Sequence, residues 1–228
     1  MVAAAVECGG ARLVRLPETI VRFLDEYHRG GVTEGDCRAC SSSCCSLGGF
    51  AILENVVAIF ERYGRGDLRR TDFEFTSGLS FREFVFQYFD VYRKTVKSGG
   101  GETTLMLFHM KSLAADGNLI SIPGGDDYWD IRKELFERNP WLNRGCVFLS
   151  KRVGNWPADD GDSGRHCILH APESKTMVSA KPVDCLFFTC NRPREGRVPA
   201  PAQSEQWFSM LAEQFPHSLS RFEALIDE

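Results

Sequence analysis

Nine cysteines are the residues of this chain most able to do chemistry, and eight of them form two groups of four. The first group lies in the run CRACSSSCC, and the second is spread over the later part of the chain. The eight are Cys37, Cys40, Cys44, Cys45, Cys146, Cys167, Cys185 and Cys190. A tight turn across C-x-x-C aims two thiolates at one ion, at about 2.3 Å from each sulfur. The pattern therefore predicts a metal centre held by sulfur.

The adjacent pair Cys44–Cys45 indicates how the first group can be used. Neighbouring side chains point to opposite faces of a strand and about 100° apart on a helix, so they rarely serve one ion together. The pair suggests two centres, a multinuclear cluster, or one ligand beside one packed thiol. Several thiolates carry more negative charge than one divalent ion neutralises, so nearby donors must offset the excess. Arg38 and the three serines at 41–43 are placed to do so.

Sulfur-rich ligand sets favour zinc or iron, including iron–sulfur clusters, over magnesium or calcium. The sequence does not choose between zinc and iron. His166 and His170 flank Cys167, and either could replace a thiol as a ligand or support one. Disulfide bonds and reduced, packed cysteines are the alternatives for the eight thiols. Cys8 stands alone near the N-terminus, where we expect no site role.

Overall composition restricts where the chain works and what it binds. The 228 residues carry a formal net charge of -4, with a pI near 5.8, which argues against a broad nucleic-acid surface. No apolar run approaches the roughly 20 residues of a membrane helix, and the first residues lack the basic and long apolar regions of a secretory signal. We therefore expect a cytoplasmic protein with a metal ion as partner. In a reducing compartment, clustered cysteines bind metal more often than they form bridges.

The cysteine segments resemble those of the YkgJ-type cysteine-cluster family, whose members are described as zinc- or iron-chelating domains. The resemblance rests on C-x2-C-x3-CC and on the later runs GCVFL, CILHAP and DCLFFTC. It covers roughly residues 35–60 and 144–192, and all eight clustered cysteines match. The first run has one residue more than the tightest family pattern. The resemblance implies metal binding, and, because the family includes relatives of a flagellin lysine methylase, it leaves an enzyme open.

Apolar periodicity predicts the elements that must position these thiols. Helices are expected over 17–29, 52–63, 80–98, 127–139, 207–214 and 219–226. The third begins at a capping box, Ser80 with Glu83, and is expected to include Tyr88 and Tyr92 and to end at the glycines 99–101. Strands from Thr103 and from Leu119 should form a hairpin around 116–117. Short strands and loops should fill 145–194.

The expected fold is α+β, a mainly helical single domain over 1–228 with a small β-hairpin or sheet and a cysteine-rich metal-binding region. The C-terminal helices should occupy about 204–228. His109 is expected in the core or at a strand edge, and Glu54 on the solvated side of a helix. The acidic run at 159–164 lacks the ligand positions of an EF-hand and is interpreted as a turn.

Three functions remain open from the sequence. The first is a metal-binding protein holding zinc or iron. The second is an iron–sulfur redox or sensing protein. The third is a methyltransferase-like enzyme with the cluster as scaffold, against which the missing glycine-rich cofactor pattern counts.

Overall fold

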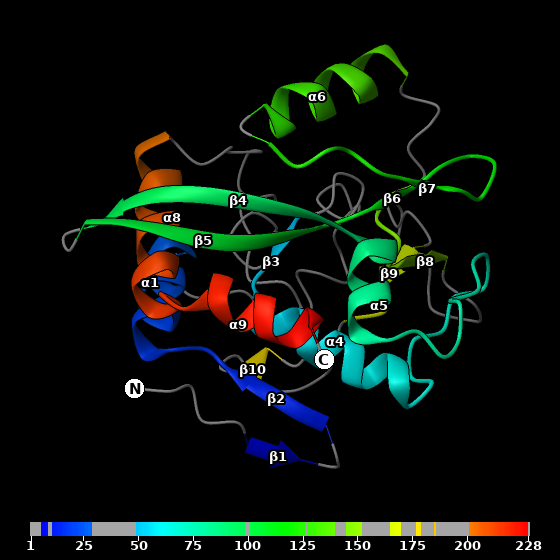
Figure 1. Cartoon of the computed structure of the whole chain (residues 1–228), viewed down its shortest axis with the longest axis horizontal. Coiled ribbons are helices and arrows are strands. Elements are labelled where there is room, and N and C mark those ends of the chain that lie inside the picture. Colours follow the sequence, from blue (N-terminus) through cyan, green and yellow to red (C-terminus); the bar gives the residue numbers. More distant parts are fainter. Residues whose placement is uncertain are drawn as a thin grey trace.

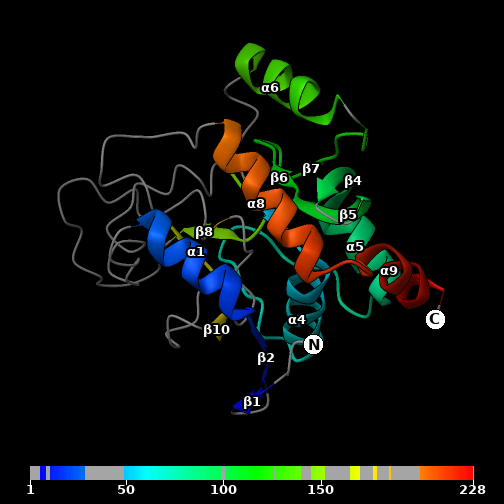
Figure 2. The same cartoon turned by 90° about the vertical axis from the view of Figure 1, so that its left-hand side faces the viewer.

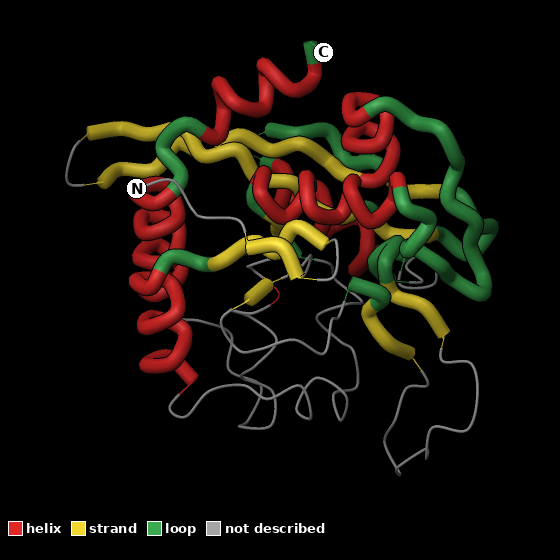
Figure 3. The backbone as a smooth tube through the Cα atoms, turned by 90° about the horizontal axis from the view of Figure 1, so that it is seen from below, coloured by secondary structure: helices red, strands yellow, loops and turns green. Residues whose placement is uncertain are grey.

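The computed structural model describes residues 6–8, 11–28, 49–98, 101–125, 127–139, 145–151, 165–169, 177–178, 185 and 201–227. Its centre is a three-stranded antiparallel sheet in the order β3, β5, β4 (Figure 1). These strands span Phe50–Ala51 (β3), Gly101–Met110 (β5) and Phe89–Ser98 (β4). β4 and β5 pair along their whole length, from Phe89 opposite Met110 to Ser98 opposite Gly101, and run side by side in Figure 3.

Smaller antiparallel sheets surround this centre. One has the order β1, β2, β10, and two others pair β6 with β7 and β8 with β9. Their bounds are Val6–Cys8 (β1), Ala11–Arg15 (β2), Ser112–Leu113 (β6), Leu119–Ile120 (β7), Leu149–Lys151 (β8), Arg165–Cys167 (β9) and Met177–Val178 (β10). The combination of helices with small antiparallel sheets confirms the predicted α+β class.

The helices largely follow the predicted periodicity. They are α1 (Glu18–His28), α4 (Leu53–Gly64), α5 (Phe81–Tyr88), α6 (Tyr128–Arg138), α8 (Pro201–Gln214) and α9 (Ser218–Ile226). The capping box of α5 is present: the Glu83 amide donates to Ser80 Oγ at 3.3 Å, and the Ser80 amide donates to the Glu83 carboxylate at 2.8 Å. In the described ranges, no helix is both long and apolar enough to cross a membrane.

Two predictions around the central hairpin were wrong. The third helix ends at Tyr88, because residues 89–98 alternate between the two sheet faces and find ten partners along β5. Gly101, with φ of 126°, therefore begins a strand instead of ending a helix. The long strand pairs with β4 and not with the segment at Leu119. The turn at 116–117 instead joins the short strands β6 and β7.

The central sheet separates two apolar cores. Along β5, Leu105 and Leu107 pack with α1 and α8, whereas Met106, Phe108 and Met110 pack with α4, α5 and α9. Figure 2 shows α1 and α8 on one side of the strand pair, and α5 and α9 on the other. Because side chains alternate along a strand, neighbouring residues of β5 lie in different surroundings. This alternation decides which core each candidate site residue enters.

Candidate functional site

Three of the eight clustered cysteines lie in the described part of the chain. They are Cys146, Cys167 and Cys185, and all three are reduced. The others, Cys37, Cys40, Cys44, Cys45 and Cys190, lie outside the described residues, as do His170, Arg38, the serines at 41–43 and the acidic run at 159–164. Cys8 is in β1 opposite Ala11. The predicted meeting of the early and late groups therefore stays a prediction.

The three late cysteines belong to the same core. Cys146 and Cys185 are buried within the cluster formed by α4, α5, α9 and one face of β5, and the half-buried Cys167 packs against it. β8 and β9 bring Cys167 opposite Leu149, three residues after Cys146. Among the described residues, no three His, Cys, Asp or Glu side chains lie close enough together to hold an ion by themselves.

Cys146 has the most fully defined surroundings of the three. Its thiol donates to the Met110 thioether, with 3.7 Å between the two sulfurs, and it accepts from the Phe148 amide at 3.4 Å. Burial, followed by the charge of Cys167, raises the pKa of Cys146 to about 12. The metal-free thiol is therefore protonated at neutral pH, and a metal ion would have to displace that proton.

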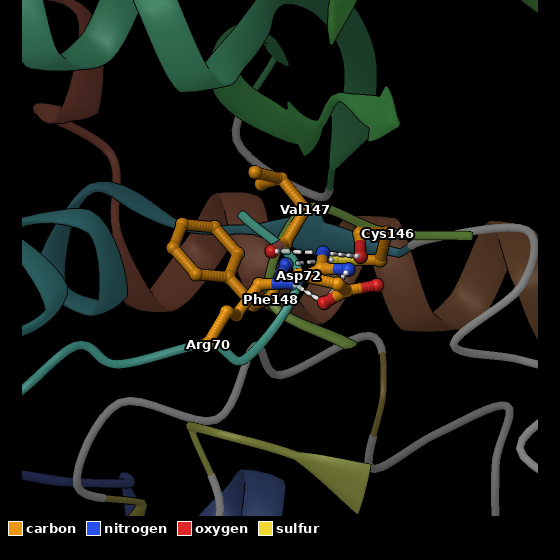
Figure 4. Close-up of polar contacts among 5 residues, drawn as sticks. All are labelled: Arg70, Asp72, Cys146, Val147 and Phe148. Atoms are coloured by element: carbon orange, nitrogen blue, oxygen red, sulfur yellow. Dashed lines mark hydrogen bonds and ion pairs between the residues drawn. The ribbon is translucent and has the colours of Figure 1, made fainter. Parts of the chain in front are cut away.

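A buried arginine fixes the backbone at this cysteine (Figure 4). Arg70 Nη1 donates to the carbonyl oxygens of Cys146 at 3.3 Å and Val147 at 2.7 Å. Its Nε and Nη2 donate to the Asp72 carboxylate at 3.0 and 2.8 Å, and the side chain is only 1% exposed. The planar guanidinium thus holds the turn at 146–147 against the segment at 70–72.

Two further arginines reach the same region from helices. Arg62 of α4 donates to the Ile168 carbonyl, next to Cys167, at 3.0 Å. Arg132 of α6 is 3% exposed and donates to Ser112 Oγ at 3.1 Å, and Ser112 pairs with Cys146 through an isolated bridge. The positive charges of Arg70 and Arg132 partly oppose the upward shift in the pKa of Cys146. Cations that could balance thiolates are therefore close to the late group.

Sequence reasoning missed these arginines and assigned the balancing role to Arg38 and its neighbouring serines. Nothing in the sequence distinguishes Arg62, Arg70 and Arg132 from the rest of the 27 Lys and Arg residues. Their burial depends on tertiary contacts with residues up to 106 positions away.

A second polar centre is buried on the opposite face of the sheet. Asp90 of β4 accepts from the Ile122 amide at 3.1 Å and from the Tyr128 hydroxyl at 3.3 Å. Burial raises the pKa of Asp90, although the two donors and the charges of Lys111 and Arg132 act against the rise. His109 stands directly opposite Asp90 in the strand register. Asp90 was not among the residues predicted from sequence, because a single Asp in an expected helix gave no signal.

His109 confirms its predicted place in the core. The ring is fully buried and packs edge-on against Phe50 and Trp129, with centroids 5.3 and 5.5 Å apart. Burial, and then the charge of Arg132, lower the pKa of His109 well below its ordinary value of 6.5, so the imidazole is neutral. Its surroundings are those of an aromatic core residue.

Glu54 and His166 are the remaining candidates within the described residues. Glu54, in the first turn of α4, pairs with Arg221 of α9 and is 11% exposed, so it is less solvated than predicted. This ion pair ties the two helices together. His166 lies in β9 opposite Ser150.

Comparisons with protein-family models, with curated proteins and with solved structures found no match to this chain.

Proposed function

We propose that this protein binds a metal ion, zinc or iron, through its clustered cysteines, with an iron–sulfur cluster as one form of the iron. The proposed ligands are Cys37, Cys40, Cys44, Cys45, Cys146, Cys167, Cys185 and Cys190. The observation that carries the proposal is the setting of Cys146. A buried sulfur there already accepts an amide hydrogen bond and lies near two buried arginines.

The hydrogen bond to this sulfur supports a ligand role. An amide donor at 3.4 Å stabilises a thiolate more than a neutral thiol, because the acceptor then carries negative charge. Groups in this position orient metal ligands and tune the bound ion. The Phe148 amide is held in place because the next amide, that of Leu149, donates to the Cys146 carbonyl at 2.8 Å. The donor therefore needs no rearrangement when the thiol loses its proton.

The buried arginines support the same role through charge. A divalent ion with four thiolates has a net charge of about -2, which is costly to bury unless cations lie nearby. Arg70 is already paired with Asp72. Arg132 donates to the neutral Ser112 hydroxyl, interacts with Tyr128 and Asp90, and also brings positive charge toward Cys146. A thiolate centre would use this charge.

Metal binding would also stabilise the fold. About a hundred residues separate the early and late cysteine groups. An ion that joins them closes this long segment, and its binding free energy then contributes to folding free energy.

Elemental analysis of anaerobically purified protein tests the proposal. We expect bound zinc or iron in the wild type and reduced metal content in both Cys40→Ser and Cys185→Ser, since one change affects each group. Cys8→Ser is the matched control and should keep the wild-type content. Full metal in both Cys40→Ser and Cys185→Ser would reject a centre shared by the two groups.

Visible spectroscopy of the same samples separates the two metals. Zinc has a filled d shell and leaves the protein colourless, whereas an iron–sulfur cluster gives a coloured sample. Iron content with visible absorbance that disappears in Cys185→Ser would assign the cluster.

A further inference from the structure

We infer that Met110 is an additional sulfur ligand of the proposed centre and that this centre therefore accepts monovalent copper, Cu(I). The inference rests on the proposed function, namely a metal ion held by the cysteines. The added ligand is a methionine, a residue type that the cysteine pattern does not contain. Met110 is at the end of β5, is 2% exposed, and places its thioether against the Cys146 thiol.

The distance between the two sulfurs fits shared coordination. Two sulfurs that each lie about 2.3 Å from one ion are about 3.8 Å apart in tetrahedral coordination and about 4.0 Å apart in trigonal coordination. The Cys146 and Met110 sulfurs are 3.7 Å apart. In the metal-free protein the Cys146 thiol donates to the Met110 thioether, so the two sulfurs already face each other. A cation can replace the thiol proton without moving either side chain far.

Cys167 is the next donor of the proposed set. It packs against the same core, and its charge acts on Cys146. Among the described residues, no three His, Cys, Asp or Glu side chains form a group that could hold an ion, and a thioether is not one of these donor types. With Met110, the described residues give a proposed set of three sulfurs: Cys146, Cys167 and Met110.

A thioether changes which metal such a set prefers. Thiolate and thioether sulfurs are soft donors that select Cu(I), whereas zinc sites use thiolate, imidazole and carboxylate. Binding of Cu(I) breaks two S–H bonds, releases both protons to solvent and forms two copper–thiolate bonds. Met110 donates a lone pair without losing a proton, and copper keeps its oxidation state. The resulting net charge of -1 is smaller than that of a zinc tetrathiolate and suits a buried site near Arg132.

Methionine also fills gaps in apolar cores, so the test must separate packing from ligation. Met106 is the matched control, because it lies on the same strand and in the same core and is 1% exposed. Full-length protein is stripped of metal, kept reduced, and titrated with Cu(I) and separately with Zn²⁺, each in competition with a chromophoric chelator. The variants are Met110→Leu and Met106→Leu.

We expect Met110→Leu to weaken Cu(I) binding by at least about 10-fold, the smallest loss expected even for a group that only supports a ligand, and to leave Zn²⁺ binding unchanged. Met106→Leu should change neither affinity. X-ray absorption at the copper edge of selenomethionine-labelled protein provides a readout that needs no substitution at the site. Copper–selenium scattering is expected in the wild type and in Met106→Leu, and not in Met110→Leu.

Failure of this inference can be distinguished from failure of the proposed function. Protein that binds zinc or iron through cysteines but shows no copper–selenium scattering would overturn the role of Met110 alone. Equal Cu(I) affinities of Met110→Leu and Met106→Leu would do the same. Protein that binds none of the three metals would overturn the proposed function and this inference together.

Discussion

The two faces of the central sheet each bury a polar centre, and the two centres are built differently. His109 and Met110 are neighbours on β5, yet the first lies beside Asp90 and the second beside Cys146. The Asp90 carboxylate accepts hydrogen bonds from two groups of the protein, the Ile122 amide and the Tyr128 hydroxyl. The Cys146 sulfur has an amide and a thioether, and sulfur makes only weak hydrogen bonds. An ion that replaces the thiol proton of Cys146 therefore disrupts only weak hydrogen bonds, although it must also overcome the raised pKa of this buried thiol, whereas Asp90 serves the fold.

A close backbone contact strengthens the Asp90 centre. The loop at 121–125 lies directly against β4, and a Cβ at Gly124 would be 2.2 Å from the Val91 carbonyl oxygen. Only glycine permits this approach. The same loop carries the Ile122 amide that donates to Asp90. A larger residue at 124 would push this donor away from its acceptor.

Among the changes that separate the two centres, Asp90→Ala is expected to have the largest effect on the free energy of unfolding. This change leaves the buried Ile122 amide and Tyr128 hydroxyl without their acceptor. We expect a loss of about 3 kcal/mol in the free energy of unfolding, measured by urea denaturation. Metal content should stay near the wild-type level, because Asp90 lies on the other face from Cys146, although the charge of Arg132 acts on both.

Asp90→Asn is the matched control, because it keeps an acceptor for the Ile122 amide, removes the charge, and replaces the oxygen that accepts from the Tyr128 hydroxyl with an NH2 group. It should cost well under half as much as Asp90→Ala. Equal losses in the two variants would mean that the negative charge, and not the acceptor geometry, holds this centre together.

Unlike Asp90→Ala, Cys146→Ser should change how much a bound metal ion stabilises the protein. In metal-free protein the change is small in volume but places a hydroxyl in an apolar core, so we expect a loss of about 1 kcal/mol that does not depend on metal. At a Zn²⁺ concentration of 100 times the dissociation constant, the wild type should gain about 2.7 kcal/mol, and the variant should gain much less. Melting curves with and without the ion measure this difference. A metal-dependent gain of the same size in both proteins would remove Cys146 from the centre.

The sequence predicts the scaffold better than the sites, for a physical reason. Helices such as α4 and α6 follow from local periodicity, and the Ser80–Glu83 capping box follows from two residues three positions apart. The strand at 89–98 was mistaken for helix because its apolar residues satisfy both periods, and only the pairing with β5 decides.

The surroundings of the candidate sites depend on contacts that have no local pattern. Arg70 meets Val147 from 77 residues away, and Met110 meets Cys146 from 36 residues away. The cysteine spacing indicates which atoms could bind metal. It does not indicate which arginines and thioethers lie around them.

Arg70→Lys tests how far the turn at Cys146 depends on the guanidinium. Lysine keeps the charge but cannot donate to Asp72 and to two carbonyl oxygens in one plane. We expect a loss of about 2 kcal/mol in the free energy of unfolding, because buried acceptors are left unpaired. Arg65→Lys is the control, since its pair with Asp67 is exposed and should contribute little. If both changes cost the same, Arg70 does not fix the turn at Cys146.

The smallest expected effect is the pH dependence that Asp90 gives to the free energy of unfolding. Burial raises its pKa in the folded protein above the ordinary 3.8, so the folded state holds this proton more tightly than the unfolded chain. Its contribution to stability is therefore fully present below pH 3.8 and is lost as pH rises through the folded pKa. The stability of the wild type relative to Asp90→Asn should fall across this window, by at most about 1.4 kcal/mol per pH unit.

Carboxylates with lowered pKa, such as Asp116, titrate in the opposite sense in both proteins and cancel in the difference. Urea denaturation of the two proteins from pH 3.5 upward measures the difference, and a difference that rises with pH would show that Asp90 is stabilised in its charged form.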